Sequence, residues 1–93
     1  MQKSSNITTT GTSDPLTFSV NSIMGFGTTG TADDYVASVE VQLVNNGNWY
    51  TIQDAIEDGV AYSSNAGCVA TRLNVSSMGT ATSIDFEVNG TQE

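Results

Sequence analysis

The sequence predicts an all-β protein, a small antiparallel β-sandwich of about six strands. Several short segments alternate apolar and polar residues with a period of two, which is the pattern of a half-buried strand. Gly, Asn and Ser separate these segments at intervals of roughly 8 to 15 residues, a spacing typical of sandwiches and barrels. No segment has a sustained helical period. Because the chain has 93 residues, we expect one domain with one small core.

The first segment, residues 1–14, predicts a flexible arm. It is rich in Ser, Thr and Gly, and Ile7 is its one branched apolar residue. Such a segment buries too little surface to offset the entropy of ordering, so we expect it to be disordered until a partner covers it. The folded domain is predicted to begin at Pro15 and to span residues 15–93.

The strands are predicted from alternation, one after another. The first covers residues 16–20, where three apolar side chains alternate with Thr and Ser. Residues 21–34 then predict a long loop, because three glycines break the pattern around Met24 and Phe26. Residues 54–59 fit either one helical turn or a loop, and we favour a turn that leads into a short strand. The later strands are expected at residues 35–44, 48–53, 60–62, 68–75 and 82–88.

Residues 39–52, VEVQLVNNGNWYTI, predict a β-hairpin with a two-residue turn at Asn46 and Gly47. In this register Val44 lies opposite Trp49, on a face that is otherwise polar. The core-facing side then carries Val41, Leu43, Tyr50 and Ile52. A three-residue loop mixes the two faces, so the two-residue turn is favoured. The single tryptophan is therefore predicted on the polar face, near the tip.

Three interpretations of Trp49 follow from this position. It covers Val44 as an ordinary cross-strand pair. Alternatively it anchors an interface, since tryptophan is enriched among the residues that dominate binding energy. In the third interpretation it is a platform on which a sugar ring stacks, together with tyrosines from elsewhere in the chain: Tyr35, Tyr50 and Tyr62.

Charge and cysteine content exclude several classes of function. Ten carboxylates against Lys3 and Arg72 give a net charge of −8, so nucleic acid is not an expected partner. Cys68 is the single cysteine and the chain has no histidine, which excludes an intrachain disulfide and argues against a zinc site. We find neither a signal peptide nor an apolar span long enough to cross a membrane. We therefore expect a protein that is made in the cytoplasm and is neither secreted nor inserted in a membrane.

Other constellations carry weaker signals. Loop acids offer oxygen ligands for calcium but lack EF-hand spacing, so solvated acids are favoured and no metal or cofactor is predicted: Asp33, Asp34, Asp54, Glu57 and Asp58. Asp85 and Glu87 share an outward face without a cleft, which is not an acid/base pair. Without a histidine partner, Cys68 is expected to be a packed residue and not a nucleophile. No catalytic residue is predicted, and the chain is not expected to be an enzyme.

The strings NNGNWYTI and ATRLNVSS resemble segments of the small all-β structural proteins of tailed bacteriophages. In those proteins a hairpin ending in an aromatic–x–x–Ile pattern precedes a strand of the Val-Arg-x-Asn-Val type, and the resemblance covers about residues 16–88. It implies an immunoglobulin-like or jelly-roll-like sandwich. It also implies a virion component, such as a capsid decoration or fibre accessory protein, that docks on the major capsid protein or another virion protein.

These observations lead to two expectations of different class. In the first, the chain self-associates, expected as a homotrimer, because it has a small core and no disulfide or metal to stabilise it. The interface residues are then Trp49, Val44, Met24 and Phe26, the last two because a monomer is expected to leave them uncovered in their loop. The alternative is a carbohydrate-binding sandwich that uses Trp49.

Overall fold

The computed structural model describes residues 2–64 and 66–90, and these form strands, turns and loops without a helix. The prediction of an all-β fold is confirmed, with more strands than expected. The described residues contain nine strands in chain order: β1 (Gln2–Ile7), β2 (Gly11–Thr12), β3 (Leu16–Ser22), β4 (Met24–Gly30), β5 (Val36–Gln42), β6 (Trp49–Gln53), β7 (Ala61–Ser63), β8 (Cys68–Ser77) and β9 (Ile84–Gly90).

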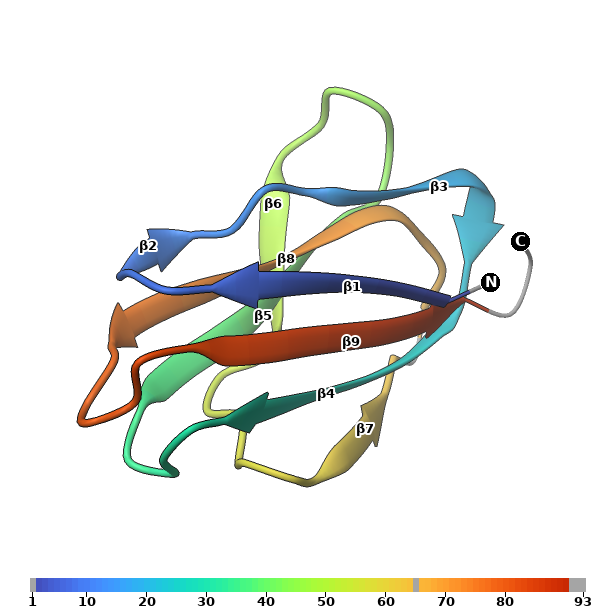
Figure 1. The fold of residues 1–93 in the computed structure, drawn as a ribbon. Coiled ribbons are helices and arrows are strands. Elements are labelled where there is room, and N and C mark those ends of the chain that lie inside the picture. Colours follow the sequence, from blue (N-terminus) through green and yellow to red (C-terminus); the bar gives the residue numbers. More distant parts are fainter. Residues whose placement is uncertain (1, 65, 91–93) are drawn as a thin grey trace.

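The strands form two antiparallel sheets (Figure 1). One sheet has four strands in the order β1-β9-β4-β7. The other has five, in the order β2-β8-β5-β6, with β3 also paired to β8. Strands β2 and β3 follow each other along the same edge of β8, because Gly11 lies opposite Val75 and Leu16 lies opposite Thr71. Together they act as one interrupted edge strand.

The pairing of the strands is nested along the chain. If β2 and β3 count as one strand, the first strand pairs with the last, the second with the last but one, and so on inward. The successive pairs are β1 with β9, β2/β3 with β8, β4 with β7, and β5 with β6. The chain therefore folds as one long hairpin whose tip is the β5–β6 hairpin.

The core lies between the two sheets and takes its side chains from both. Strand β9 alternates strictly, with its four buried positions starting at Ile84, as its sequence predicts. Strand β8 supplies Leu73 and Val75 from the other sheet. The largest fully buried apolar side chains are Phe86, Met24, Leu73, Ile84, Val39 and Val75. Every buried polar side-chain atom among the described residues has a hydrogen-bond partner, as native interiors require.

The structure corrects the prediction of a flexible arm over residues 1–14. Strand β1 pairs with β9 over its full length, from Gln2 opposite Asn89 to Ile7 opposite Ile84. Ile7 is buried in the core, and Ser13 donates its backbone N–H to the carbonyl oxygen of Leu73. An edge strand is held by backbone hydrogen bonds and needs few apolar side chains, so composition alone missed it. Met1 lies outside the described residues.

The structure also corrects the prediction of a loop over residues 21–34. Half of this segment is strand β4, in which Met24, Phe26 and Thr28 point inward and are buried. Gly25 and Gly27 alternate with them on the outer face, so the period of two was present but was hidden by residues without side chains. A larger residue at Gly27 would be crowded, since a Cβ at this position would lie 3.0 Å from the carbonyl oxygen of Val60.

Candidate functional site

The tip of the β5–β6 hairpin turns one residue earlier than predicted. The backbone N–H of Gly47 donates to the carbonyl oxygen of Val44 at 3.0 Å, which makes Asn45 and Asn46 the central residues of the turn. Asn46 has a φ of 61°, a left-handed conformation that Asn tolerates better than most residues. The prediction took Asn46 and Gly47 as the two central residues of the turn, whereas Gly47 is the last residue of the turn in the structure.

This shift changes the cross-strand partners but keeps the faces. Trp49 lies opposite Gln42, where the prediction placed it opposite Val44. Tyr50 lies opposite Val41. Because the register moves by one residue on each strand, Trp49 still shares the outer face of the sheet with Glu40 and Gln42. The predicted face of Trp49 is therefore confirmed and its predicted partner is wrong.

On the outer face, Trp49 lies against a cation from β8, the strand on the far side of β5. The guanidinium carbon of Arg72 sits 4.2 Å from the centroid of the indole ring, a cation–π contact. Arg72 Nε also donates to Glu40 Oε1 at 2.6 Å, and Asn74 Nδ2 donates to Glu40 Oε2 at 3.2 Å. Glu40 and Arg72 face each other across β5 and β8. One face of the indole is therefore covered by side chains of its own protomer.

Apolar side chains gather around the same hairpin and remain exposed. Of the eight large apolar side chains that are well exposed in the described part of the chain, four belong to it: Leu43 (40%), Val44 (63%), Tyr50 (51%) and Ile52 (38%). The hairpin tip extends beyond the body of the two sheets (Figure 1). The sequence placed Leu43, Tyr50 and Ile52 on a buried face, and that prediction is wrong at these positions. Ile52 also falls at a register shift, opposite the step from Val39 to Glu40.

The structure does not bring the four predicted interface residues together. Trp49 and Val44 lie in the hairpin, and Val44 is the more exposed of the two. Met24 is fully buried and Phe26 is 5% exposed, both in the core of the protomer. The expectation that a monomer leaves these two uncovered is therefore corrected, because β4 turns their side chains inward.

Sequence reasoning missed the partners of Trp49. In the structure the cation that contacts Trp49 is Arg72, and Arg72 also pairs with Glu40. A signal for this was present. Glu40 lies on the polar face of one predicted strand, and Arg72 alternates with buried residues in another. The sequence does not show that these two strands are neighbours, and this pairing is what places Glu40 beside Arg72.

The tyrosines do not form an aromatic strip with Trp49. Tyr35 is buried, and Tyr62 packs against Phe26 in the other sheet with ring centroids 5.6 Å apart. Tyr50 follows Trp49 directly in β6, so the two side chains point to opposite faces. The arrangement that a sugar-stacking platform needs is absent from the described residues.

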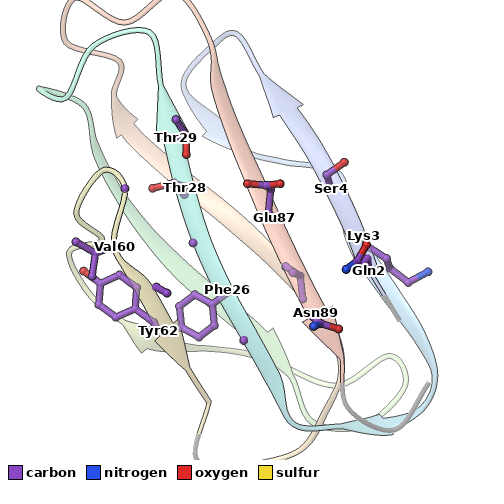
Figure 2. A pocket seen from close by; sticks show the side chains of 15 residues that line it. Gln2, Lys3, Ser4, Phe26, Thr28, Thr29, Val60, Tyr62, Glu87 and Asn89 are labelled. Carbon is purple, nitrogen blue, oxygen red and sulfur yellow. The ribbon is translucent and has the colours of Figure 1, made fainter.

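A groove of about 680 Å³ lies along the four-stranded sheet (Figure 2). Gly25 and Gly27 leave β4 without outward side chains there, between Glu87 and Asn89 of β9 and the segment around Val60. Figure 2 shows Ser4 and Gln2 beyond β9, and Phe26 beside Tyr62. Among the described residues that line the groove, Glu87 is the one carboxylate. A single carboxylate supplies no acid/base pair.

Two of the loop acids that offer oxygen atoms, Asp34 and Asp58, accept hydrogen bonds from other groups of the protein. Asp58 Oδ1 accepts hydrogen bonds from the hydroxyl of Tyr35 at 2.9 Å and from the backbone N–H of Gly30 at 2.7 Å. Asp34 accepts from the backbone N–H of Thr80, and this hydrogen bond holds the pKa of Asp34 below its ordinary value. Within residues 2–64 and 66–90, no group of three or more ligating side chains is close enough to hold a metal.

Two further titratable groups lie inside the fold. Burial raises the pKa of Tyr35 to about 12, and its hydroxyl is also within 2.7 Å of Thr28 Oγ1. Burial likewise raises the pKa of the Cys68 thiol, whose sulfur lies 4.0 Å from that of Met24. Such a thiol is mostly protonated near neutral pH and inaccessible, which agrees with the prediction of a packed residue.

Comparisons with family models, with curated proteins and with solved structures give no match for this chain. In the described part of the chain there is no helix that is long and apolar enough to cross a membrane. Fold and site thus define an acidic all-β protein with two sheets, a groove along one of them and an exposed apolar hairpin.

Proposed function

We propose that this chain is a virion structural protein, a capsid decoration or accessory protein that self-associates and docks on the viral shell. The observation that carries the proposal is the exposed apolar hairpin. Leu43, Val44 and Tyr50 are exposed on one hairpin of an otherwise acidic protein, and such a concentration of exposed apolar side chains marks an interaction site. The role in a virion follows from the sequence resemblance.

The nested strand pairing supports a jelly-roll sandwich as the type of fold. A jelly roll has eight strands in two sheets, and it serves as the scaffold of many viral capsid and lectin domains. Counting β2 and β3 as one strand gives eight strands here, four in each sheet. Fold alone does not define function, so the hairpin remains the stronger support.

Charge supports protein as the partner. Ten carboxylates against two cations favour docking on a basic protein surface and disfavour nucleic acid. One of the two cations, Arg72, is already engaged with Glu40. The partners we propose are a second copy of this chain and the major capsid protein or another virion protein. The site of action is the virion, after synthesis in the host cytoplasm.

The carbohydrate-binding alternative lacks a supporting observation. A sugar platform needs aromatic rings on one face, and the three tyrosines do not share a face with Trp49. An enzyme has no support either, because the groove residues form no acid/base or nucleophile–base arrangement.

Co-sedimentation with virus particles tests the proposal. Lysates of cells that produce the virus are separated on a density gradient, and the chain is followed by mass spectrometry. We expect it in the particle fractions at a fixed ratio to the major capsid protein. Val44→Asp should lower this ratio about tenfold, as loss of an interface anchor does. Val20→Asp, at another exposed valine, in β3 (49% exposed against 63% for Val44), is the control and should leave the ratio unchanged. A wild-type chain that stays at the top of the gradient contradicts the proposal.

A further inference from the structure

Three of the four sheet edges in this fold carry features that prevent another strand from adding to them. At one edge of the five-stranded sheet, Asp14 and Pro15 interrupt the line from β2 to β3. In the four-stranded sheet, β7 is three residues long, and β1 carries Lys3 opposite the buried Val88. Proline, very short strands and inward-facing charges are the known means by which proteins block edge pairing.

The fourth edge, β6, has none of these three features, and its one irregularity is the register shift at Ile52. Its sequence, WYTIQ, contains no charge, no proline and no glycine. It pairs on one side with β5 and on its other side with no strand of the described chain. All five residues are exposed or half-buried, including the apolar Tyr50 and Ile52. An open, uncharged, apolar edge is a template for pairing with another chain.

We propose that β6 pairs antiparallel with β6 of a second copy, around a two-fold axis at Thr51. This register places Tyr50 opposite Ile52 of the other copy, and Trp49 opposite Gln53. The exposed apolar side chains of one copy then meet those of the other, which stabilises cross-strand pairing. A second copy fits because residues 49–53 contain none of the ten carboxylates, so like charges do not meet along the paired strands.

The pairing closes at two copies. A two-fold contact uses the same surface on both subunits, and the opposite edge of the five-stranded sheet is blocked at Asp14 and Pro15. The product is a dimer with one continuous sheet, not a fibre and not the trimer expected from the sequence. This dimer is a specific form of the self-association proposed above, and the choice of a second copy as the partner rests on that proposed function.

Charge reversal at the two-fold axis tests the pairing. Thr51 is exposed on the outer face, so substitutions there should leave the protomer folded. The wild type should sediment at twice the 9.7 kDa chain mass. Thr51→Lys and Thr51→Glu should each weaken the dimer at least about tenfold. On a two-fold axis, residue 51 of one copy lies beside residue 51 of the other, so two like charges repel each other. An equimolar mixture of the two variants should restore the dimer, since opposite charges then meet.

Cross-linking gives a second readout. Thr51→Cys should form a disulfide-linked dimer under mild oxidation, whereas Thr17→Cys, on the opposite edge of the same sheet, should not. The native Cys68 is buried and does not compete. A wild-type monomer at micromolar concentration, a trimer, or a dimer that both Thr51 charge variants leave intact overturns the edge pairing. A monomer that still co-sediments with virus particles overturns this inference alone, and a dimer that does not co-sediment overturns the proposed function alone.

Discussion

The guanidinium of Arg72 stacks on the indole of Trp49, with 4.2 Å between the guanidinium carbon and the ring centroid. The same guanidinium pairs with Glu40, so its position is fixed from two directions. Trp49 therefore has one face covered by its own chain, and it remains half-buried. The rest of the indole is available to a partner that pairs along β6.

Trp49→Ala is predicted to weaken self-association more than folding. The indole loses its contacts with the second copy, which should cost association about 2 kcal/mol or more, as at interface hot spots. The protomer loses mainly the contact with Arg72, about 0.5–1 kcal/mol at such an exposed site. Sedimentation and chemical unfolding measure the two effects. Val41→Ala, in the core beneath the same hairpin, is the control that should lower folding stability. If Trp49→Ala unfolds as readily as this control, Trp49 is a core residue and the assignment is wrong.

The stacking of Trp49 on Arg72 is predicted to be energetically coupled. A double-mutant cycle of Trp49→Leu and Arg72→Met on folding stability should give a coupling energy of about 0.5–1 kcal/mol. The Arg72–Glu40 ion pair is partly exposed, with side chains 24% and 14% accessible, so it should add little at physiological salt. Additive effects of the two substitutions are the outcome that contradicts the contact.

Met24→Ala is predicted to destabilise the fold by about 2–5 kcal/mol without a separate effect on assembly. The Met24 side chain is fully buried between the sheets, so its truncation leaves a cavity. Urea unfolding of the variant measures the cost, and sedimentation under conditions where the variant is folded measures assembly. A variant of normal stability with impaired assembly is inconsistent with the core position of Met24.

Folding stability is predicted to fall between pH 10 and pH 12 because of Tyr35. Burial raises its pKa to about 12, while an unfolded tyrosine titrates at about 10. The folded state thus holds the phenolic proton more tightly. Its contribution to stability is complete below pH 10 and is lost as the pH rises through the folded pKa. Urea unfolding at several pH values measures the slope, which should be smaller in Tyr35→Phe. If the free energy of unfolding falls with pH as steeply in Tyr35→Phe as in the wild type, other groups cause the loss of stability at alkaline pH.

The sequence predicts the parts of the fold in which side chains alternate clearly. Strands β8 and β9 follow from the period of two, because each buries one face, and the same alternation gives the face on which Trp49 lies. Strand β4 was missed because its outward positions are largely glycine, and β1 because it is held by its backbone on β9. In both strands the ladder hydrogen bonds are formed by groups that every residue carries.

The site was harder to predict than the fold. The face of Trp49 follows from register parity, but its contact with Arg72 depends on β5 lying between β6 and β8. The exposure of Tyr50 likewise depends on the arrangement of the strands, not on the local sequence. A local pattern marks Tyr50 as apolar and core-facing, and whether a second sheet covers that face depends on how the whole chain is arranged.

Hydrogen exchange measured at several protein concentrations tests the central claim most directly. If copies pair through β6, amides of residues 49–53 that point away from β5 should gain protection as the concentration rises, because they enter hydrogen bonds across the two-fold axis. Amides of β3, on the opposite edge of the same sheet, serve as the internal reference and should exchange at a constant rate. Protection in β6 that is independent of concentration, or protection that grows along β3 instead, contradicts the assignment of this hairpin as the assembly surface.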